Sequence, residues 1–366
     1  MSATSQTQQH GLITAQAPSN IALVKYMGKT STEGNLPANG SLSMTLDSLC
    51  TWARVRESRG GLNWNSDLFR GDEKVGSFSL RVPELSQRGK ERILRHLSRV
   101  LEEAPAILSQ VGLRSRVPQG LELGAANTFP AASGIASSAS SFAAVTWAGV
   151  AACADSFSDF QKAWQTSSEL RRFLAKLSRK GSGSSCRSME GPWVRWEGQD
   201  AWRVSGTSVP DYTDLVLLAG KEEKEVSSSE AHVRVTTSPL WQGRVERATA
   251  RLGHVESALI TGDINALAEQ VWQESWEMHS LFHTASPPFT YWLPRSVDIL
   301  RFFAHPQRFQ DLPRPVVTMD AGPNVHVLVP TAFAQQWRAQ IESAFPHLEI
   351  LEDRCGKGAR GWSEGQ

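Results

Sequence analysis

A run of small residues that passes without a break into an apolar segment constrains this chain more than any other feature. Between Asn127 and Val145 the sequence reads NTFPAASGIASSASSFAAV. Such side chains let backbone N–H groups crowd around an anion, and a helix beginning there adds unpaired N–H groups and the positive end of its dipole. The segment predicts either a phosphate-binding loop or a small-residue helix packed tightly against a neighbour, and its own residues leave both open.

This loop matches neither of two common nucleotide-binding patterns. It lacks the Gly-Lys-Ser/Thr ending of a P-loop and the G-x-G-x-x-G turn of a dinucleotide-binding domain. The formal net charge of the 366-residue chain is +1, so no general attraction to nucleic acid or to an anionic membrane is predicted. Any specificity for phosphate must therefore come from a local site.

The cysteines and the N-terminal segment indicate a cytoplasmic protein. The 4 cysteines are widely spaced and form no C-x-x-C pair, which argues against a zinc site or a disulfide framework and fits a reducing compartment. The first residues lack the basic and apolar regions of a signal peptide, and no stretch approaches the length of a membrane span. We therefore expect neither a membrane nor a nucleic acid as partner.

Hydrophobic periodicity predicts helices and strands without a repeating β-α alternation, which favours the α+β class. A buried helix should follow the small-residue segment that starts at Asn127, called the glycine-rich loop below. Other helices are expected over residues 86–110, 160–177, 241–278 (interrupted near 261–263) and 335–345. Strands are expected over residues 41–46, 121–123, 194–196, 202–204, 215–218, 315–319 and 325–329. Residues 1–14 are expected to form a disordered leader and residues 352–366 a mobile tail.

Two segments carry basic residues in places that a purely structural role explains poorly. In residues 17–29, Lys25 alternates into an apolar strand, where a lysine needs an anion or must be neutral; the alternative is an edge strand with its lysines in solvent. Residues 179–188 combine glycines and hydroxyl groups with Arg187, whose planar fork suits a carboxylate or a phosphate. The alternative for this second segment is a flexible linker.

Two further segments are open to two interpretations each. The hydroxyl-rich residues 224–229 follow a strand, and by themselves they more often form a turn with a helix cap. Asp320 closes an apolar strand beside a Gly-Pro turn. It is either a turn-capping residue or a carboxylate held in a cleft to accept a proton or orient a hydroxyl.

Taken in this order, the segments resemble the diphosphomevalonate decarboxylase family, which belongs to the GHMP kinase superfamily of galactokinase, homoserine kinase, mevalonate kinase and phosphomevalonate kinase. The resemblance extends from about residue 17 to residue 329, and the pair Met278-His279 followed by PPFTY resembles the bacterial members. The matching motifs are NIALVKYMGK (20–29), LPANGSLSMTL (36–46), the loop that starts at Asn127, GSGSSCRS (181–188), VSS (226–228) and MDAGPN (319–324).

The resemblance implies a GHMP-kinase-like fold of two parts. An N-terminal α/β sandwich with the glycine-rich phosphate loop and a C-terminal ferredoxin-like half would enclose a deep cleft. We expect the N-terminal nucleotide-binding domain over residues 15–190 and the C-terminal domain over residues 191–351. A homodimer is expected as well.

The resemblance also implies a reaction. ATP would phosphorylate the tertiary 3-hydroxyl of mevalonate 5-diphosphate, and loss of that phosphate and of carbon dioxide would give isopentenyl diphosphate. By analogy, Asp320 orients or deprotonates the 3-hydroxyl, Lys25 neutralises charge beside it, and Arg187 clamps the substrate carboxylate. The other substrate-binding residues implied are Asn20, Ser182 and Ser184, together with Tyr26, Lys29, Ser227 and Ser228 at the diphosphate.

ATP and Mg²⁺ are the cofactors that the resemblance implies. The residues expected around the ATP phosphates are Asn127, Ser133, Gly134, Ser137 and Ser138, with Mg²⁺ bridging the phosphates and Ser138 as its ligand. The sequence departs from the family pattern at Met27 (usually Trp), Ser133 (usually Ala) and Ala125-Ala126 (usually Ser-Glu).

Three alternatives stay open at this level. Two of them keep the fold: a decarboxylase that converts mevalonate 5-phosphate to isopentenyl phosphate, and a kinase that phosphorylates the 3-hydroxyl without decarboxylation. The diphosphate is favoured over the monophosphate by the presence of Tyr26, Lys29, Ser227 and Ser228. A simple kinase is disfavoured by the presence of Lys25, Arg187 and Asp320. The third is a ligand-binding relative without activity, because Ala125-Ala126 removes residues expected near the nucleotide.

Overall fold

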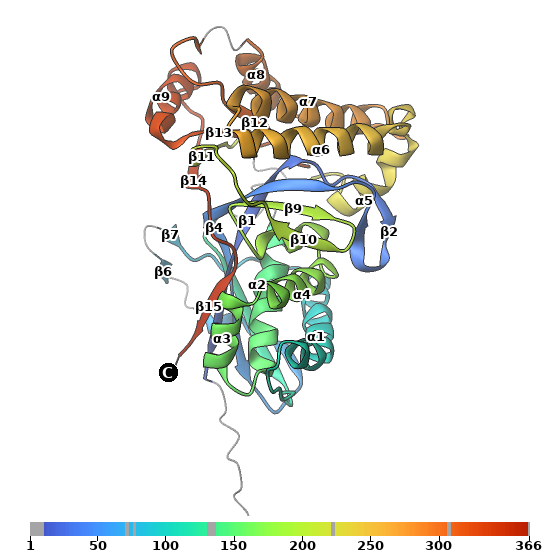
Figure 1. Cartoon of the computed structure of the whole chain (residues 1–366), viewed down its shortest axis with the longest axis vertical. Helices are drawn as coiled ribbons and strands as arrows, with labels where there is room; N and C mark the ends of the chain where they lie inside the picture. Colours follow the sequence, from blue (N-terminus) through green and yellow to red (C-terminus); the bar gives the residue numbers. More distant parts are fainter. Residues whose placement is uncertain are drawn as a thin grey trace, which may run out of the picture.

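The N-terminal half of the chain is built on a seven-stranded sheet (Figure 1). The computed structural model describes residues 11–69, 73–75, 78–129, 137–220, 224–305 and 309–364. Within them the sheet runs in the order β10-β9-β4-β1-β15, β8 pairs with β4, and β5 pairs with β8. Its strands are β1 (Ile13–Val24), β4 (Ser41–Glu57), β5 (Leu62–Trp64), β8 (Leu121–Asn127), β9 (Trp193–Glu197), β10 (Asp200–Arg203) and β15 (Arg360–Ser363).

Strand β4 confirms the strand expected over residues 41–46 and changes partners along its 17 residues. Residues 41–44 pair with β9, whereas residues 51–57 pair with β8. Successive side chains of a strand point to opposite faces, so Ser41 and Ser43 lie on the same face. Two small hairpins accompany the sheet: β2 (Lys29–Ser31) with β3 (Leu36–Pro37), and β6 (Lys74–Val75) with β7 (Phe78–Ser79).

Helix α2 (Ser137–Cys153) confirms the buried helix expected here, and residues 130–136 before it lie outside the described residues. From Phe142 onward all its side chains are buried, because the helix packs against β1 and β4 and is flanked by α1 and α4. Helix α1 (Gln87–Gln110) confirms the helix expected over residues 86–110. The Ser86 side chain caps its start, and the helix buries Ile93, Leu97, Val100 and Leu101.

One helix prediction in this half was wrong. Residues 160–177 were expected to form a single helix, but the structure has α3 (Phe157–Thr166) and α4 (Ser168–Arg179). Ser167 lies between them in an extended conformation, and its side chain accepts a hydrogen bond from the backbone N–H of Leu170. Capping by a serine therefore starts a second helix where the apolar periodicity had suggested continuity.

The C-terminal half is built on a four-stranded sheet in the order β12-β13-β11-β14, in which every pair is antiparallel. Its elements follow the chain as β-α-β-β-α-β, which is the ferredoxin-like arrangement that was expected. The strands are β11 (Tyr212–Leu217), β12 (Val316–Thr318), β13 (Val325–Pro330) and β14 (Ile350–Arg354). The helices are α5 (Ser228–Arg234), α6 (Arg244–Thr261), α7 (Ile264–His283), α8 (Pro294–Phe303) and α9 (Ala334–Ala344).

Helices cover both faces of this second sheet. Apolar side chains of β11 point alternately to the two faces, so each face needs a covering layer. Val216 belongs to the core formed with α6 and α7, whereas Leu215 and Leu217 belong to the core formed with α8 and α9. The predicted interruption near residues 261–263 is confirmed: Gly262 ends α6 with a φ of 77°, a left-handed conformation that favours glycine, and Asp263 caps α7.

The two halves share one hydrophobic core. It contains Ile21 of β1 and Leu42 of β4 from the first sheet, together with Val216 of β11 and Leu252 and Val271 of the α6–α7 pair. The helix pair α6–α7 therefore lies beside the end of the N-terminal sheet, as Figure 1 shows in yellow and orange. This arrangement brings the end of β1 close to the second half.

The structure corrects the expected division of the chain. Strands β9 and β10 lie beyond residue 190 and yet belong to the first sheet, so the halves meet between β10 and β11. The tail is not free: β15 pairs with the first residues of β1, where Ile13 lies opposite Ser363. In Figure 1 the chain runs back from β14 to β15, and this return adds a strand to the N-terminal sheet. Strand β1 already begins at Ile13, within the leader expected over residues 1–14, and residues 1–10 lie outside the described residues.

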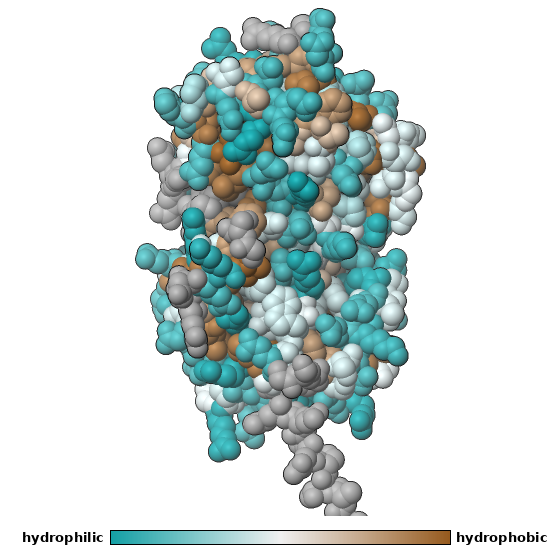
Figure 2. Space-filling view, turned by 90° about the vertical axis from the view of Figure 1, so that its left-hand side faces the viewer, coloured by the Kyte–Doolittle hydropathy of each residue, from teal (hydrophilic) through white to brown (hydrophobic). Residues whose placement is uncertain are grey.

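Hydrophilic residues cover most of the molecular face shown in Figure 2, with hydrophobic residues visible between them in small groups. Within the described residues, every helix is too short or too polar to cross a lipid bilayer.

Candidate active site

A cavity of about 290 Å³ gathers most of the predicted site residues. Its walls come from both halves of the chain: the segment after β1, the short helix at Gly183–Ser188 and α2 on one side, and α5, α7 and the loop after β12 on the other. The predicted residues that line it are Lys25, Tyr26, Lys29, Ser138, Ser182, Ser184, Arg187, Ser227, Ser228 and Asp320.

An ion pair between Lys25 and Asp320 joins the two halves at this cavity. The distance between Lys25 Nζ and Asp320 Oδ1 is 2.8 Å, and Lys25 Nζ also donates to the carbonyl oxygen of Ala22 at 2.7 Å. The Lys25 side chain is 1% exposed, whereas 26% of the Asp320 side chain is exposed. The lysine is therefore enclosed, and the carboxylate is the member of the pair that a ligand can reach.

Burial and attraction oppose each other in this pair. Burial lowers the pKa of Lys25 below its usual range, although the charge of Asp320 counteracts the effect. For Asp320, burial favours the neutral acid, but the charge of Lys25 and its hydrogen bond outweigh burial and hold the pKa of the carboxyl below its usual range. Asp320 is thus a carboxylate at neutral pH.

Arg187 is buried beneath the cavity and is held by neutral oxygens. Its Nη1 donates to Ser41 Oγ at 2.6 Å, and its Nε donates to Ser43 Oγ at 3.1 Å and Asn20 Oδ1 at 3.3 Å. The alternation of β4 places the two serines on one face, where they receive these bonds. Within the described part of the chain, Arg187 makes no ion pair with a carboxylate. A buried guanidinium in this state calls for an anionic ligand.

Asn20 is near the cavity but behind Arg187. It does not line the cavity; its Nδ2 donates to Ser188 Oγ at 2.8 Å and to the carbonyl oxygen of Ser184 at 3.2 Å. Together with its contact to Arg187 Nε, these bonds fix the position of the guanidinium. The predicted substrate contact of Asn20 is therefore indirect in this structure.

Two lysines and two serines of the cavity lining, Lys29, Lys224, Ser227 and Ser228, form what we call the basic end of the cavity. Lys29 Nζ donates to Asn35 Oδ1 at 2.8 Å, and burial together with the charge of Arg92 lowers the pKa of Lys29. Ser227 is the N-cap of α5, since its Oγ accepts from the backbone N–H of Glu230, and Ser228 is the first residue of that helix. The helix-cap interpretation of this segment is confirmed, and the same serines line the cavity.

Three further residues with basic side chains line the cavity, although sequence reasoning did not single them out as ligands. Arg92 is an exposed residue of α1, and Lys224 is a partly buried residue whose pKa burial lowers. His232 accepts a hydrogen bond from the backbone N–H of Gly28 at its Nδ1, at 3.0 Å, and burial lowers its pKa to about 3. Of these three residues, only Lys224 could have been suspected from the sequence, because it begins the hydroxyl-rich segment 224–229. An arginine or a histidine on an amphipathic helix gives none.

The charge of the cavity is strongly unbalanced. Among the described residues that line it, Lys25, Lys29, Arg92, Arg187 and Lys224 are basic, whereas Asp320 is the sole carboxylate. Cations gathered in a cleft raise the local concentration of anions. The cavity therefore suits a ligand that carries several negative charges.

The residues predicted around the ATP phosphates fall into three groups. Ser138 lines the cavity at the start of α2 and accepts a hydrogen bond from Ser182 Oγ at 3.2 Å. Ser137 opens the same helix on its exposed side, and Asn127 is buried at the end of β8, where its Oδ1 accepts from Thr51 Oγ1 at 2.8 Å. Ser133 and Gly134 lie outside the described residues.

Two of the three departures from the family pattern are buried side chains. Met27 is 3% exposed and packs with Val226, Met278 and Tyr291. Ala125 and Ala126 are buried within β8. The third, Ser133, is again outside the described residues.

The described residues fit a magnesium ion that is held mainly by phosphates. They contain no group of three or more His, Cys, Asp or Glu side chains placed to hold a metal ion. Magnesium, however, usually takes only one or two protein ligands and completes its shell with phosphate oxygens and water. Ser138, the predicted ligand, supplies a hydroxyl to this cavity from the start of α2.

Comparison with known proteins covers both halves of the chain. The family described as "Diphosphomevalonate decarboxylase-like N-terminal domain" matches residues 17–207, and the family described as "Mevalonate 5-diphosphate decarboxylase C-terminal domain" matches residues 214–360. The diphosphomevalonate decarboxylase of Ganoderma lucidum is 32% identical, over 95% of this chain and 86% of its own length.

Solved structures resemble the chain over nearly its whole length. A mevalonate diphosphate decarboxylase from Legionella pneumophila is 33% identical, with a TM-score of 0.73 over 93% of this chain and 100% of that one. The protein MDDEF, solved in complex with MVAPP, AMPPCP and magnesium, is 26% identical, with a TM-score of 0.73 over 96% of this chain and 99% of that one.

Proposed function

This chain belongs to the diphosphomevalonate decarboxylase family, and we propose that it converts mevalonate 5-diphosphate and ATP to isopentenyl diphosphate, ADP, phosphate and carbon dioxide. The observation that carries the proposal is the Lys25–Asp320 ion pair at a cavity with a large excess of basic side chains. The pair offers a reachable carboxylate to a hydroxyl group, and the basic side chains offer sites to the anionic groups of the same ligand.

The proposed chemistry explains why a carboxylate with a low pKa is useful. A tertiary hydroxyl is a poor leaving group, so transfer of the terminal phosphoryl group of ATP to it makes its departure feasible. Phosphoryl transfer needs little proton abstraction in the transition state. Asp320, whose pKa is held low by Lys25, is a weak base, so its main contribution is to orient the 3-hydroxyl and to stabilise positive charge developing at C3.

Carbon dioxide leaves after the phosphate has begun to depart. The electrons of the bond between C2 and the carboxylate then form the new double bond between C2 and C3. Arg187 is proposed to hold that carboxylate, with Ser182 and Ser184 on the same wall of the cavity. Its bonds to Ser41 and Ser43 fix the plane of the guanidinium, which supports a directional contact.

The basic end of the cavity supports a diphosphate over a monophosphate. Tyr26, Lys29, Ser227 and Ser228 are proposed to hold the two phosphate groups, and Lys224 adds a further cation. A monophosphate would leave part of this set of donors and cations without a phosphate group to bind. The decarboxylase of mevalonate 5-phosphate is therefore the second candidate rather than the first.

ATP and Mg²⁺ are the proposed cofactors, supported by the AMPPCP and magnesium in the complex of MDDEF. The proposed phosphate-binding residues are Asn127, Ser133, Gly134, Ser137 and Ser138. The position of Ser138 at the start of α2 supports this assignment, because a helix N-terminus favours anions. Mg²⁺ would neutralise charge on the phosphates, held on the protein side by Ser138. A homodimer and a cytoplasmic location stay predictions.

The experiment that tests this function supplies the purified protein with ATP, Mg²⁺ and mevalonate 5-diphosphate. We expect isopentenyl diphosphate, ADP, phosphate and carbon dioxide in equal amounts. Accumulation of a 3-phosphorylated product without carbon dioxide would instead identify a kinase. Nucleotide binding without any product would identify a ligand-binding relative.

A further inference from the structure

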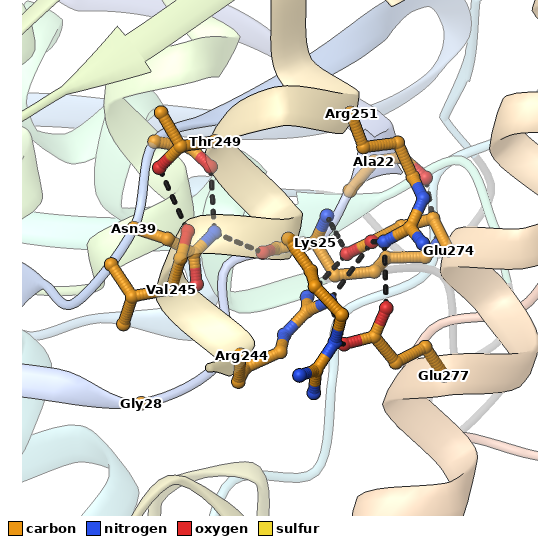
Figure 3. A network of polar contacts seen from close by, with 12 residues as sticks. Ala22, Lys25, Gly28, Asn39, Arg244, Val245, Thr249, Arg251, Glu274 and Glu277 are labelled. Atoms are coloured by element: carbon orange, nitrogen blue, oxygen red, sulfur yellow. Dashed lines mark hydrogen bonds and ion pairs between the residues drawn. The ribbon is translucent and has the colours of Figure 1, made fainter. Parts of the chain in front are cut away.

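A buried network of charges lies directly behind Lys25 (Figure 3). Glu274 of α7 is fully buried and is paired with Arg244 and Arg251 of α6. Its Oε2 accepts from Arg251 Nη1 at 2.6 Å and from Arg244 Nη1 at 2.9 Å. Its Oε1 accepts from the backbone N–H of Lys25 at 3.0 Å. One carboxylate thus joins the helix pair to the chain that carries the lysine.

The next residue of α7 makes the corresponding contact on the other side of the ion pair. Ser275 is 4% exposed, and its Oγ accepts from the backbone N–H of Met319 at 3.1 Å. Met319 directly precedes Asp320 in the chain. Two consecutive residues of one helix therefore hold the backbone of Lys25 and the backbone beside Asp320.

We propose that Glu274 and Ser275 are positioning residues that set the geometry of the Lys25–Asp320 pair. The proposal rests on the proposed decarboxylase function. Lys25 follows the end of β1 and Asp320 follows the end of β12, so two segments from different halves must be aligned at one point. A rigid helix with a hydrogen bond to each segment provides that alignment, because the two acceptors cannot move independently.

Glu274 also affects the charge of Lys25. Its negative charge favours the protonated lysine, as does that of Asp320, while burial and the charge of Arg187 oppose it. Other titratable groups also face the pair: burial lowers the pKa of His279 of α7 to about 3 and keeps it neutral, while His326 of β13 and Lys224 each interact with the charge of Asp320. Removal of the charge of Glu274 should therefore allow Lys25 to lose its proton at a lower pH.

The first test compares Ser275→Ala with Ser280→Ala on the same helix. Both variants remove one hydroxyl, but among the described residues Ser280 Oγ donates to the carbonyl oxygen of Trp276 alone, and Ser280 does not line the cavity. We expect Ser275→Ala to lower kcat roughly ten- to a hundredfold, the range expected for a small misplacement of reacting groups, with the KM for both substrates unchanged. Ser280→Ala should match the wild type.

The second test compares Glu274→Gln with Glu277→Gln. Glu277 pairs with the same two arginines, with Arg251 Nη1 at 2.8 Å and Arg244 Nη1 at 3.3 Å, but among the described residues the Lys25 backbone N–H donates to Glu274 and not to Glu277. Both variants should therefore lower the melting temperature. Only Glu274→Gln should lower kcat and shift the alkaline limb of the kcat–pH profile toward lower pH.

The positioning role is contradicted if Ser275→Ala keeps kcat within twofold of the wild type, or if Glu277→Gln shifts the alkaline limb as far as Glu274→Gln does. If a variant in one of the two comparisons fails to fold, the other comparison tests the positioning role. Wild-type turnover is measured in the same assay. Its absence contradicts the proposed function, whereas wild-type turnover combined with an unaffected Ser275→Ala contradicts only the positioning role.

Discussion

Lys25 Nζ and Asp320 Oδ1 lie 2.8 Å apart although the two residues are 295 positions apart in the sequence. Lys25 follows β1 in the first half, and Asp320 follows β12 in the second. A buried ion pair is weak support for stability, because desolvation offsets much of the attraction. The position of this pair on the wall of a cavity instead fits a role in binding and reaction.

Asp320→Asn should abolish turnover while leaving substrate and nucleotide binding nearly intact. The replacement has the same shape but removes the charge that orients the 3-hydroxyl and stabilises positive charge at C3. The loss should therefore appear in kcat rather than in KM. Steady-state kinetics measure both. A kcat within about tenfold of the wild type would contradict the assignment, since groups of this kind usually contribute roughly a hundredfold or more.

Arg187→Lys should lose substantial activity even though it keeps the positive charge. A lysine has no planar fork, so it cannot donate to Ser41 and Ser43 and still face a carboxylate with two parallel N–H groups. The kinetics are measured with saturating substrate. If the variant matches the wild type under these conditions, Arg187 does not hold the substrate carboxylate.

The free energy of unfolding should fall as the pH is lowered from about 6.5 toward 3. Burial lowers the folded-state pKa of His96, His232 and His279 to about 3, whereas an unfolded histidine titrates near 6.5. The unfolded state therefore binds more protons in this window, at up to about 1.4 kcal/mol per pH unit for each histidine. Asp353, whose pKa burial raises to about 6, acts in the opposite direction.

His96→Asn isolates this effect, because His96 lies in the core, where its Nε2 is 2.8 Å from Thr146 Oγ1, and does not line the cavity. Denaturant unfolding at several pH values gives the free energy of unfolding as a function of pH. For the variant this free energy should fall less steeply toward low pH, by a slope that corresponds to at most one bound proton. An unchanged slope would show that His96 is protonated in the folded state.

Much of the site was predictable because its residues lie in short segments with unusual composition. Lys25 in an apolar strand, Arg187 after a glycine-serine run and Asp320 beside a Gly-Pro turn each stand out locally. Their meeting at one cavity is a property of the fold, since the pairing of β1 with β4 and the packing of α7 against β12 bring the segments together. No local pattern contains that information.

The features that were missed depend on distant partners. Residues 360–363 are too few for a recognisable period, and their strand exists through pairing with β1. Arg92 lies on the polar side of an amphipathic helix, where an arginine is ordinary until the cavity beside it is known. The proposed role of Glu274 also depends on a distant partner, because its carboxylate accepts from the backbone N–H of Lys25, 249 positions away.

The double variant Ser227→Ala, Ser228→Ala should narrow the preference for a diphosphate substrate. Both hydroxyls line the basic end of the cavity, so their loss should raise the KM for mevalonate 5-diphosphate more than that for mevalonate 5-phosphate. Because Ser227 also caps α5, a modest loss of stability, on the order of 1 kcal/mol, is expected as well. Ser238 caps the short helix at Pro239–Trp241. The Ser238→Ala variant therefore serves as a control for the loss of a helix cap. An unchanged substrate ratio would exclude these serines as diphosphate ligands.

The most direct test of the account is the release of carbon dioxide from mevalonate 5-diphosphate and from mevalonate 5-phosphate, each with ATP and Mg²⁺. A site that binds a highly charged group through several donors discriminates strongly against a ligand that lacks part of it. We therefore predict a much higher kcat/KM for the diphosphate. Comparable values, a preference for the monophosphate, or no carbon dioxide from either substrate would contradict the account.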